Sequence, residues 1–340
     1  MSRSPKRILI IGVGSIGERH LRCLQATEQA AVGLCEPVLP LRERIASQYN
    51  VELAFDSLDV ALEQPWDSAV VATPANTHIP IAMRLVEAGI APLIEKPLAV
   101  AEAGVAELVE ALDRTQLVAG VAYVYRAHPA LQAMRDALLA GKFGKPLQVT
   151  VIAGQHFPTY RPTFADTYYN DRARGGGATQ DALTHLVNSA EWLVGPITRL
   201  TADMAHLKLP DVTVEDTVHV LARHGQVLGS YSLNQHQAPN EMTMTVICEN
   251  GTARWELHRH AWRWMATPDS PWEEQVIDFK SRDDWFTAQE RAWLDVLAGE
   301  AEPLCTVREA WQTLRATRAM LSAAERDDAW QTLTTEETLA

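Results

Sequence analysis

The chain has 340 residues, of which 47% are hydrophobic and 21% charged, a composition typical of a soluble globular protein with about two domains. Its formal net charge of −13, with no basic stripe to offset it, argues against a nucleic-acid partner. No apolar run approaches the roughly 20 residues that cross a membrane, and the first residues lead directly into a predicted strand, so we expect neither a membrane span nor a signal peptide.

The first predicted unit is a strand, a glycine-rich turn and a helix. An apolar run over residues 8–11 predicts a buried strand, and helical spacing of apolar residues follows from Ser15. Gly12, Gly14 and Gly17 have the Gly-x-Gly-x-x-Gly spacing that lets a pyrophosphate approach the backbone. The helix N-terminus adds free amides and a partial positive charge. Such a turn also arises for purely structural reasons, but the order of elements favours a dinucleotide site.

Glu36 directly follows the second predicted strand, which covers residues 31–35. It follows Gly12 at close to the ~20-residue offset at which an acidic residue meets the adenosine ribose. A carboxylate there would repel a 2′-phosphate, so we expect NAD in preference to NADP. Arg42 and Arg44 lie nearby and weaken that preference. The alternative for Glu36 is a solvated residue at a strand end.

Strands and helices then alternate as in βαβ units, which predicts an α/β fold with an N-terminal Rossmann domain, a doubly wound parallel sheet. Ligands of such sheets bind outside the carboxyl ends of the strands. The loops at Gly12, Glu36, Thr73 and Lys96 should therefore share one edge. The further strands are predicted over residues 51–55, 68–72, 93–95 and 117–121.

Lys96, within Glu95-Lys96-Pro97, is the chemical candidate at this edge. A lysine beside a nicotinamide can hold a substrate hydroxyl and favour loss of its proton. By itself the segment would more often be a charged surface turn. Its place in the predicted ligand crevice favours the chemical role.

The pattern changes near residue 122, which predicts a first domain over residues 1–122 and a second over residues 123–330. The second part is mostly strand, with Asn250-Gly251 as a strong hairpin turn. Two helices close the chain, and we expect the tail after about residue 328 to be loosely held. The main strands are predicted over residues 147–152, 199–204, 217–223, 226–233, 242–248 and 252–257.

A long polar and aromatic segment over residues 155–174 contains Tyr160 and Arg161. Segments of this length within a compact chain are usually functional or flexible. Tyrosine and arginine side chains suit a hydroxylated or partly anionic ligand. A loop that contacts a second subunit is the alternative.

A glycine triplet over residues 175–177 then introduces a helix that carries Asp181, His185 and Asn188. Residues four apart share a helix face, so Asp181 and His185 should lie side by side. An imidazole can accept a hydroxyl proton near neutral pH, and a carboxylate can orient it. Taken alone, the pair would more often be a surface ion pair.

Together these segments resemble the Gfo/Idh/MocA family (glucose-fructose oxidoreductase, inositol dehydrogenase) from about residue 6 to residue 327. The features that match, in order, are the glycine turn, Thr73-Pro74 with His78, Glu95-Lys96-Pro97, Tyr125-Arg126, and the glycine-helix run ending at Asp181 and His185. The resemblance implies that the second domain is α+β with a mostly antiparallel sheet, used for homodimer or homotetramer contacts.

The resemblance also implies residue roles. Catalysis falls to Lys96, Asp181 and His185, and no metal is expected. The substrate, a sugar, cyclic polyol or sugar acid, would contact Lys96, Tyr125, Arg126, Tyr160, Arg161, Asp181 and His185. The cofactor would be held by Gly12, Gly14, Ser15, Ile16, Gly17, Glu36, Thr73, Pro74, Asn76, His78, Glu95 and Lys96.

The implied reaction interconverts a secondary alcohol and a ketone, with hydride passing to nicotinamide C4 and the proton handled by His185 and Lys96. Two alternatives remain open. One is an enzyme that retains NAD and cleaves or eliminates a glycoside, and the other is a non-catalytic regulator that senses the cofactor. The four scattered cysteines lack metal-ligand spacing, so we expect reduced thiols and a cytoplasmic location.

Overall fold

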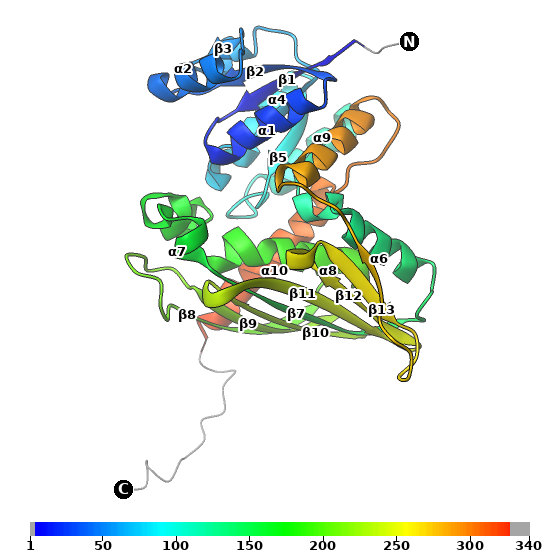
Figure 1. Ribbon diagram of the computed structural model, residues 1–340. Coiled ribbons are helices and arrows are strands. Elements are labelled where there is room, and N and C mark those ends of the chain that lie inside the picture. The colour runs from blue at the N-terminus through cyan, green and yellow to red at the C-terminus, as the bar shows by residue number, and fades with distance from the viewer. Residues whose placement is uncertain (1–3, 327–340) are drawn as a thin grey trace, which may run out of the picture.

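The computed structural model describes residues 4–326, which form two domains, each built on one β-sheet (Figure 1). The predicted loose tail after about residue 328, and the last residues of the predicted second domain, lie outside the described residues. Across residues 4–326, no helix combines the length and apolar character needed to cross a bilayer.

The first domain is the predicted Rossmann fold, a parallel sheet in the order β3-β2-β1-β4-β5-β6. Helices cover both faces, so β1 is apolar from Ile8 onward: Ile8 and Ile10 pack in one core, and Leu9 and Ile11 in another. The predicted strand over 51–55 is reduced to the two-residue edge strand β3. The strands are β1 (Lys6–Ile11), β2 (Ala30–Cys35), β3 (Ala54–Phe55), β4 (Ser68–Val71), β5 (Ala91–Glu95) and β6 (Gly120–Ala122), and the helices are α1 (Ser15–Ala26), α2 (Leu39–Gln48), α3 (Leu58–Ala61), α4 (His78–Glu87) and α5 (Val105–Thr115).

The register of this sheet brings the candidate loops together. Ile11 at the end of β1 pairs with Cys35 of β2 and with Val71 of β4, and Val71 pairs with Ile94 of β5. The carboxyl ends of four strands are therefore level. The loops that begin at Gly12, after Cys35, after Val71 and after Glu95 consequently open at one edge of the sheet, as predicted.

The second domain has a sheet in the order β14-β13-β12-β11-β7-β10-β9-β8, in which only the β7–β10 pair is parallel. This confirms the mostly antiparallel sheet. The strands are β7 (Pro146–His156), β8 (Arg199–Ala205), β9 (Thr217–His224), β10 (Val227–Asn234), β11 (His236–Cys248), β12 (Gly251–Glu256), β13 (Ala261–Met265) and β14 (Glu273–Val276).

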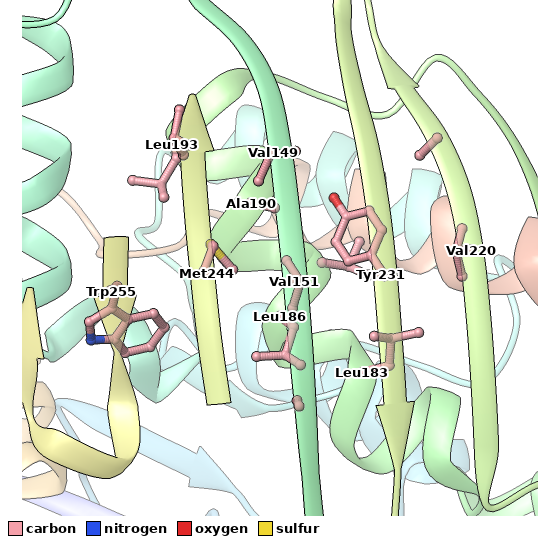
Figure 2. Packing of buried hydrophobic residues seen from close by; sticks show 14 of the residues in the cluster. Val149, Val151, Leu183, Leu186, Ala190, Leu193, Val220, Tyr231, Met244 and Trp255 are labelled. Carbon is pink, nitrogen blue, oxygen red and sulfur yellow. The ribbon is translucent and has the colours of Figure 1, made fainter. Parts of the chain in front are cut away.

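One face of this sheet is buried under the helices α6 (Pro129–Leu139), α8 (Thr184–Val194) and α10 (Val307–Ala324). Figure 2 shows Val151 and Met244 from neighbouring strands packed against Leu186 of α8. Side chains on the strands alternate between this core and the open face. Leu221 and Leu228 point the other way and are 65% and 51% exposed.

The C-terminal helices return to the first domain. Trp293 of α9 (Asp283–Leu297) packs in the same core as Ile8, and Leu314 of α10 packs in the same core as Leu9. The later turns of α10, at Met320, belong to the core of the second domain. The predicted division into 1–122 and 123–330 therefore misses this return, because the apolar faces of α9 and α10 do not reveal which sheet they cover.

Candidate active site

The glycine turn has the geometry of a phosphate cradle. Gly12 has φ +83°, and a Cβ on Gly17 would lie 1.9 Å from the Gly12 carbonyl oxygen, so both positions require glycine. A Cβ on Gly14 would meet nothing within 4 Å, which leaves space above the turn. In the part of the chain that the structure describes, no side chain caps the start of α1, so the amides of Ser15 and Ile16 remain available to an anion. These features fit a dinucleotide.

Glu36 is buried at the end of β2 and braces this turn. Its Oε2 accepts a hydrogen bond from the Val13 amide at 3.1 Å, and its Oε1 accepts one from the Val38 amide at 3.1 Å. Arg42 donates to the Glu36 carbonyl oxygen at 2.7 Å. Glu36 is therefore not a solvated strand end, and its predicted contact with the ribose stays a prediction.

The loop after β4 is tied to the loop after β5 by His78. The buried His78 ring has Nδ1 3.0 Å from the Pro97 carbonyl oxygen and Nε2 2.9 Å from the Thr73 carbonyl oxygen. Burial lowers the pKa of His78, while the hydrogen bonds to the two carbonyl oxygens oppose that shift. His78 thus holds two cofactor-edge loops together, with Pro74 in the first loop and Asn76 exposed beside it.

Lys96 reaches from the first domain to the second. Its Nζ donates hydrogen bonds to the backbone oxygen of Asp181 at 2.9 Å and to Asp181 Oδ1 at 3.2 Å. Glu95 points the other way: its buried carboxylate lies 2.9 Å from His20 Nε2 and accepts the Lys96 amide at 2.9 Å. The Glu95 side chain therefore points toward His20 of α1, whereas the Lys96 side chain points toward Asp181 of the second domain.

Asp181 is a buried anion held by several donors. Tyr168 donates from its hydroxyl to Asp181 Oδ1 at 2.7 Å, and Arg161 NH1 lies 3.6 Å from Oδ2. Burial alone would raise the pKa of Asp181, but Lys96, Arg161 and the Tyr168 hydrogen bond together hold it well below its usual value. The carboxylate is therefore ionised at physiological pH, and it is no surface ion pair.

His185 stands next to this anion without being bonded to it. The predicted helix is present, but Asp181 lies in a π-helical turn, η6 (Thr179–Leu183), that leads directly into α8 at Thr184, so the two residues do not have α-helical spacing. Within the described residues, no hydrogen bond or ion pair joins Asp181 to His185. The carboxylate instead turns toward Lys96 and Tyr168.

The Nδ1 atom of His185 is buried and has no hydrogen-bond partner among residues 4–326. The His185 ring lies 4.7 Å from the ring of Tyr125 and 5.9 Å from that of Tyr123, measured between centroids. Burial and then the charge of Lys96 lower the pKa of His185 well below 6.5. A neutral imidazole in this position can accept a proton.

The predicted substrate residues do not all gather here. Tyr125 packs against His185, and Arg161 faces Asp181. Tyr160 is 52% exposed at the end of α7 (Phe157–Tyr160). Arg126, in contrast, is buried and bonded to groups other than Lys96, Asp181 and His185, which argues against its predicted contact with the substrate. Its guanidinium is bonded to Asn188 Oδ1, the Leu304 carbonyl oxygen and Glu309 Oε1.

Two residues of the site were not singled out from the sequence. Tyr168 stands in the polar segment over 155–174, where several tyrosines compete and nothing marks the one that reaches Asp181. Arg282 directly precedes α9, and its positive charge lowers the pKa of His185, after the larger effects of burial and Lys96. No motif surrounds Arg282. Its place is set by the packing of α9 beside Tyr125, seen in the contact of Tyr125 with Trp285.

Two family models match the chain. The model described as "Oxidoreductase family, NAD-binding Rossmann fold" matches residues 6–123, and the model described as "GFO/IDH/MocA C-terminal domain" matches residues 131–254. The two matches follow one another along the chain and cover both sheets as far as β12. They confirm the order of domains that the family resemblance implies.

Individual proteins resemble the chain over most of its length. D-apiose dehydrogenase from Paraburkholderia graminis is 24% identical over 334 residues, which is 93% of this chain and 87% of that protein. Inositol 2-dehydrogenase from Rhizobium meliloti is 25% identical over 221 residues, 63% of this chain and 64% of that protein. A structure of levoglucosan dehydrogenase with NADH and levoglucosan matches with a TM-score of 0.86 at 18% identity, covering 95% of this chain and 98% of that one, which shows a shared fold.

The Rossmann sheet, the glycine cradle and the attached antiparallel domain define the class of the molecule as an NAD-binding oxidoreductase of the dehydrogenase type. Both family models carry the same family name. The chain belongs to the Gfo/Idh/MocA oxidoreductase family.

Proposed function

We propose that this protein is an NAD-dependent dehydrogenase that interconverts a secondary alcohol and a ketone on a sugar, a cyclic polyol or a sugar acid. One observation carries the proposal: Lys96 Nζ from the cofactor edge meets Asp181 across the domain boundary, beside the neutral His185 ring. The names of the relatives, dehydrogenases of apiose and inositol and a structural neighbour that holds levoglucosan, support the substrate class.

NAD, when bound, supplies the hydride acceptor at nicotinamide C4. We assign its phosphates to the glycine turn over residues 12–17, with the amides of Ser15 and Ile16 as donors, because that turn is open above Gly14. We assign the adenosine ribose to Glu36, whose carboxylate lies against this turn. The loops at Thr73 and Lys96 share the edge on which the nicotinamide would lie.

The proposed roles of the site residues follow from their charge states. His185 is neutral, so it accepts the proton of the substrate hydroxyl. Lys96 donates a hydrogen bond to the same substrate oxygen and stabilises negative charge there. Asp181 keeps the Lys96 ammonium in place through two hydrogen bonds, and Tyr168 fixes Asp181. Tyr125 orients the His185 ring through a tilted ring contact.

The charges around the site indicate which kind of substrate it would attract. Arg161 and Arg282 add to Lys96, while Asp181 supplies the opposing negative charge. Arg161 is partly exposed and aims at the Asp181 carboxylate from the polar segment over 155–174. A substrate with a carboxylate would be attracted to this excess of positive charge, so sugar acids belong beside neutral polyols in any substrate panel.

The test is the appearance of reduced-nicotinamide absorbance with NAD, and then with NADP, across myo-inositol, D-apiose, levoglucosan, D-glucose and D-glucuronate. The Lys96→Ala variant serves as the control. Signal that disappears in the variant supports the proposal and begins to name the substrate. If NADH binding is intact but no compound yields released NADH, the dehydrogenase proposal is rejected in favour of retained-NAD chemistry or a regulator.

We also propose that the protein is a cytoplasmic homodimer or homotetramer that associates through the open face of the second sheet. Apolar side chains are exposed there, including Ile152, Leu221 and Leu228. Leu221→Glu should then lower the molar mass measured by light scattering. Leu139→Glu, at an equally exposed leucine on α6, is the matched control. An unchanged mass for Leu221→Glu would exclude this face.

A further inference from the structure

A buried chain of charged side chains lies directly behind Lys96. His20 of α1 stands between two carboxylates: its Nδ1 is 2.6 Å from Glu290 Oε1 of α9, and its Nε2 is 2.9 Å from Glu95 Oε1 of β5. The other oxygen of Glu95 accepts the amide of Lys96 at 2.9 Å. We call His20, Glu95 and Glu290 the bridge. Their side chains are almost wholly inaccessible, with 0% exposure for His20 and Glu290 and 4% for Glu95.

The bridge needs both protons on the imidazole. Each of its two neighbours is a carboxylate oxygen, which can only accept, so both ring nitrogens of His20 must donate. Burial opposes the charged ring, but Glu290 and then Glu95 outweigh it and raise the pKa of His20 to about 10. Because this pKa is raised, the interaction is fully present below pH 6.5 and is lost as the pH rises through about 10.

Stability alone does not account for this bridge. A buried ion pair is about as stable as well-packed apolar side chains of the same size, or less so. Helix α9 is also anchored in other ways: Trp293 Nε1 donates to Ser68 Oγ at 3.0 Å, and Asp283 binds Arg19 and Arg22 of α1. Glu290 takes part in the bridge through one oxygen, because its Oε2 is buried and has no hydrogen-bond partner among residues 4–326.

The bridge does account for the position of Lys96. Glu95 has a fixed direction because His20 holds one oxygen while the Lys96 amide binds the other. The backbone at Lys96 is thereby fixed at the point where its side chain leaves toward Asp181, 2.9 Å from the Asp181 carbonyl oxygen. We propose that His20, bridging Glu290 and Glu95, is a positioning residue that sets the placement of Lys96 in the active site.

This inference rests on the role proposed above for Lys96, and a double-mutant cycle tests it. Glu290→Gln keeps the size of the side chain and removes the charge that holds the second proton on His20. If the bridge acts through Lys96, this substitution should lower kcat by about tenfold in the otherwise unchanged enzyme. In the Lys96→Ala background it should change kcat by less than about twofold. An equal loss in both backgrounds would overturn the proposal.

Asp283→Asn is the matched control, because Asp283 also joins α9 to α1 but has no link to Glu95. Asp283→Asn should leave unchanged the factor by which Lys96→Ala lowers kcat. Should Glu290→Gln fold poorly, as judged by its melting temperature, Glu290→Asp replaces it, since it keeps the charge and shortens the reach to His20. Loss of kcat in Asp283→Asn as large as in the Glu290 variant would show that the bridge only attaches α9.

A measurement without substrate separates this inference from the proposed function. Hydrogen exchange of the Lys96 amide reports its bond to Glu95 directly. Glu290→Gln should speed this exchange by about tenfold or more, while exchange in the core of β1 and in Asp283→Asn stays unchanged. An unchanged Lys96 amide, or a uniform rise across the domain, would overturn the proposal. If Lys96→Ala leaves kcat intact, the proposed function fails while the exchange result still decides on positioning.

Discussion

The glycine turn is complete within residues 12–17, whereas the groups around Lys96 come from β5, the polar segment over 155–174, η6 and α8. The turn is built from backbone, and its requirements are close contacts such as the 1.9 Å clash that a Cβ on Gly17 would make. The second region is built from side-chain charges that belong to two domains. A region of the first kind is sensitive to side-chain size, and one of the second kind is sensitive to charge and to how the domains pack.

The largest effect is expected where the two domains meet. Lys96→Ala and His185→Ala should each lower kcat by at least about 10²-fold, because each removes a positioned proton-transfer or hydrogen-bonding group. NADH binding, followed by fluorescence titration, should stay close to that of the unchanged protein, since the glycine turn is untouched. Near-normal turnover in both variants would reject the assignment.

The glycine turn can be dissected with two matched substitutions. Gly17→Ala places a methyl group against the Gly12 carbonyl oxygen and should lower the free energy of unfolding by about 1–3 kcal/mol. Gly14→Ala meets no protein atom and has an ordinary φ of −61°, so it should fold normally. It should nevertheless weaken NADH binding by filling the space above the turn.

Thermal unfolding and NADH titration of both variants separate these effects. Normal NADH affinity in Gly14→Ala would show that the cofactor does not approach this part of the backbone. Normal stability in Gly17→Ala would show that the turn can relax away from α1.

A smaller effect, about tenfold, is expected on cofactor choice. Glu36→Gln keeps an oxygen that can accept the Val13 amide but removes the negative charge, so the ratio of kcat/KM for NAD over NADP should fall. Comparison with Glu36→Ala, which also removes the brace on the turn, distinguishes charge from architecture. An unchanged ratio in Glu36→Gln would remove Glu36 from the ribose site.

The smallest expected effect concerns how kcat/KM depends on pH. The pKa of His185 is lowered by burial and by Lys96, so the ring remains neutral at pH values where an ordinary histidine is protonated. The acid limb of the kcat/KM profile should therefore lie below pH 6.5. A limb at or above 6.5 that depends on His185 would contradict a neutral buried ring in the free enzyme.

The same contrast explains what could be predicted from the sequence. The Rossmann order and the glycine turn depend on neighbours in the chain, so strand β1, Gly12 and Gly17 were found with their roles in the fold. Arg126 stands beside Tyr125 in sequence but binds Glu309, far along the chain, and no local pattern shows which of the two residues contacts His185.

The π-helical turn and the position of α9 could not be predicted either, because both involve contacts between residues that are distant in sequence. In the π-helical turn, the Asp181 carboxylate contacts Lys96, Tyr168 and Arg161, all from outside that turn. The pairing of α9 with α1 depends on contacts such as His20 with Glu290. Helical periodicity identifies a buried face but not the element that buries it.

Helix α10 begins in the core that contains Leu9 and ends in the core that contains Val149. A chimera that exchanged the cofactor domain at residue 122 would leave Trp293 and Leu314 facing a foreign sheet. For protein engineering, the interchangeable unit is therefore residues 1–122 together with α9 and the first turns of α10. Cofactor preference is better altered within the loops of the parallel sheet than by transplanting the domain that contains them.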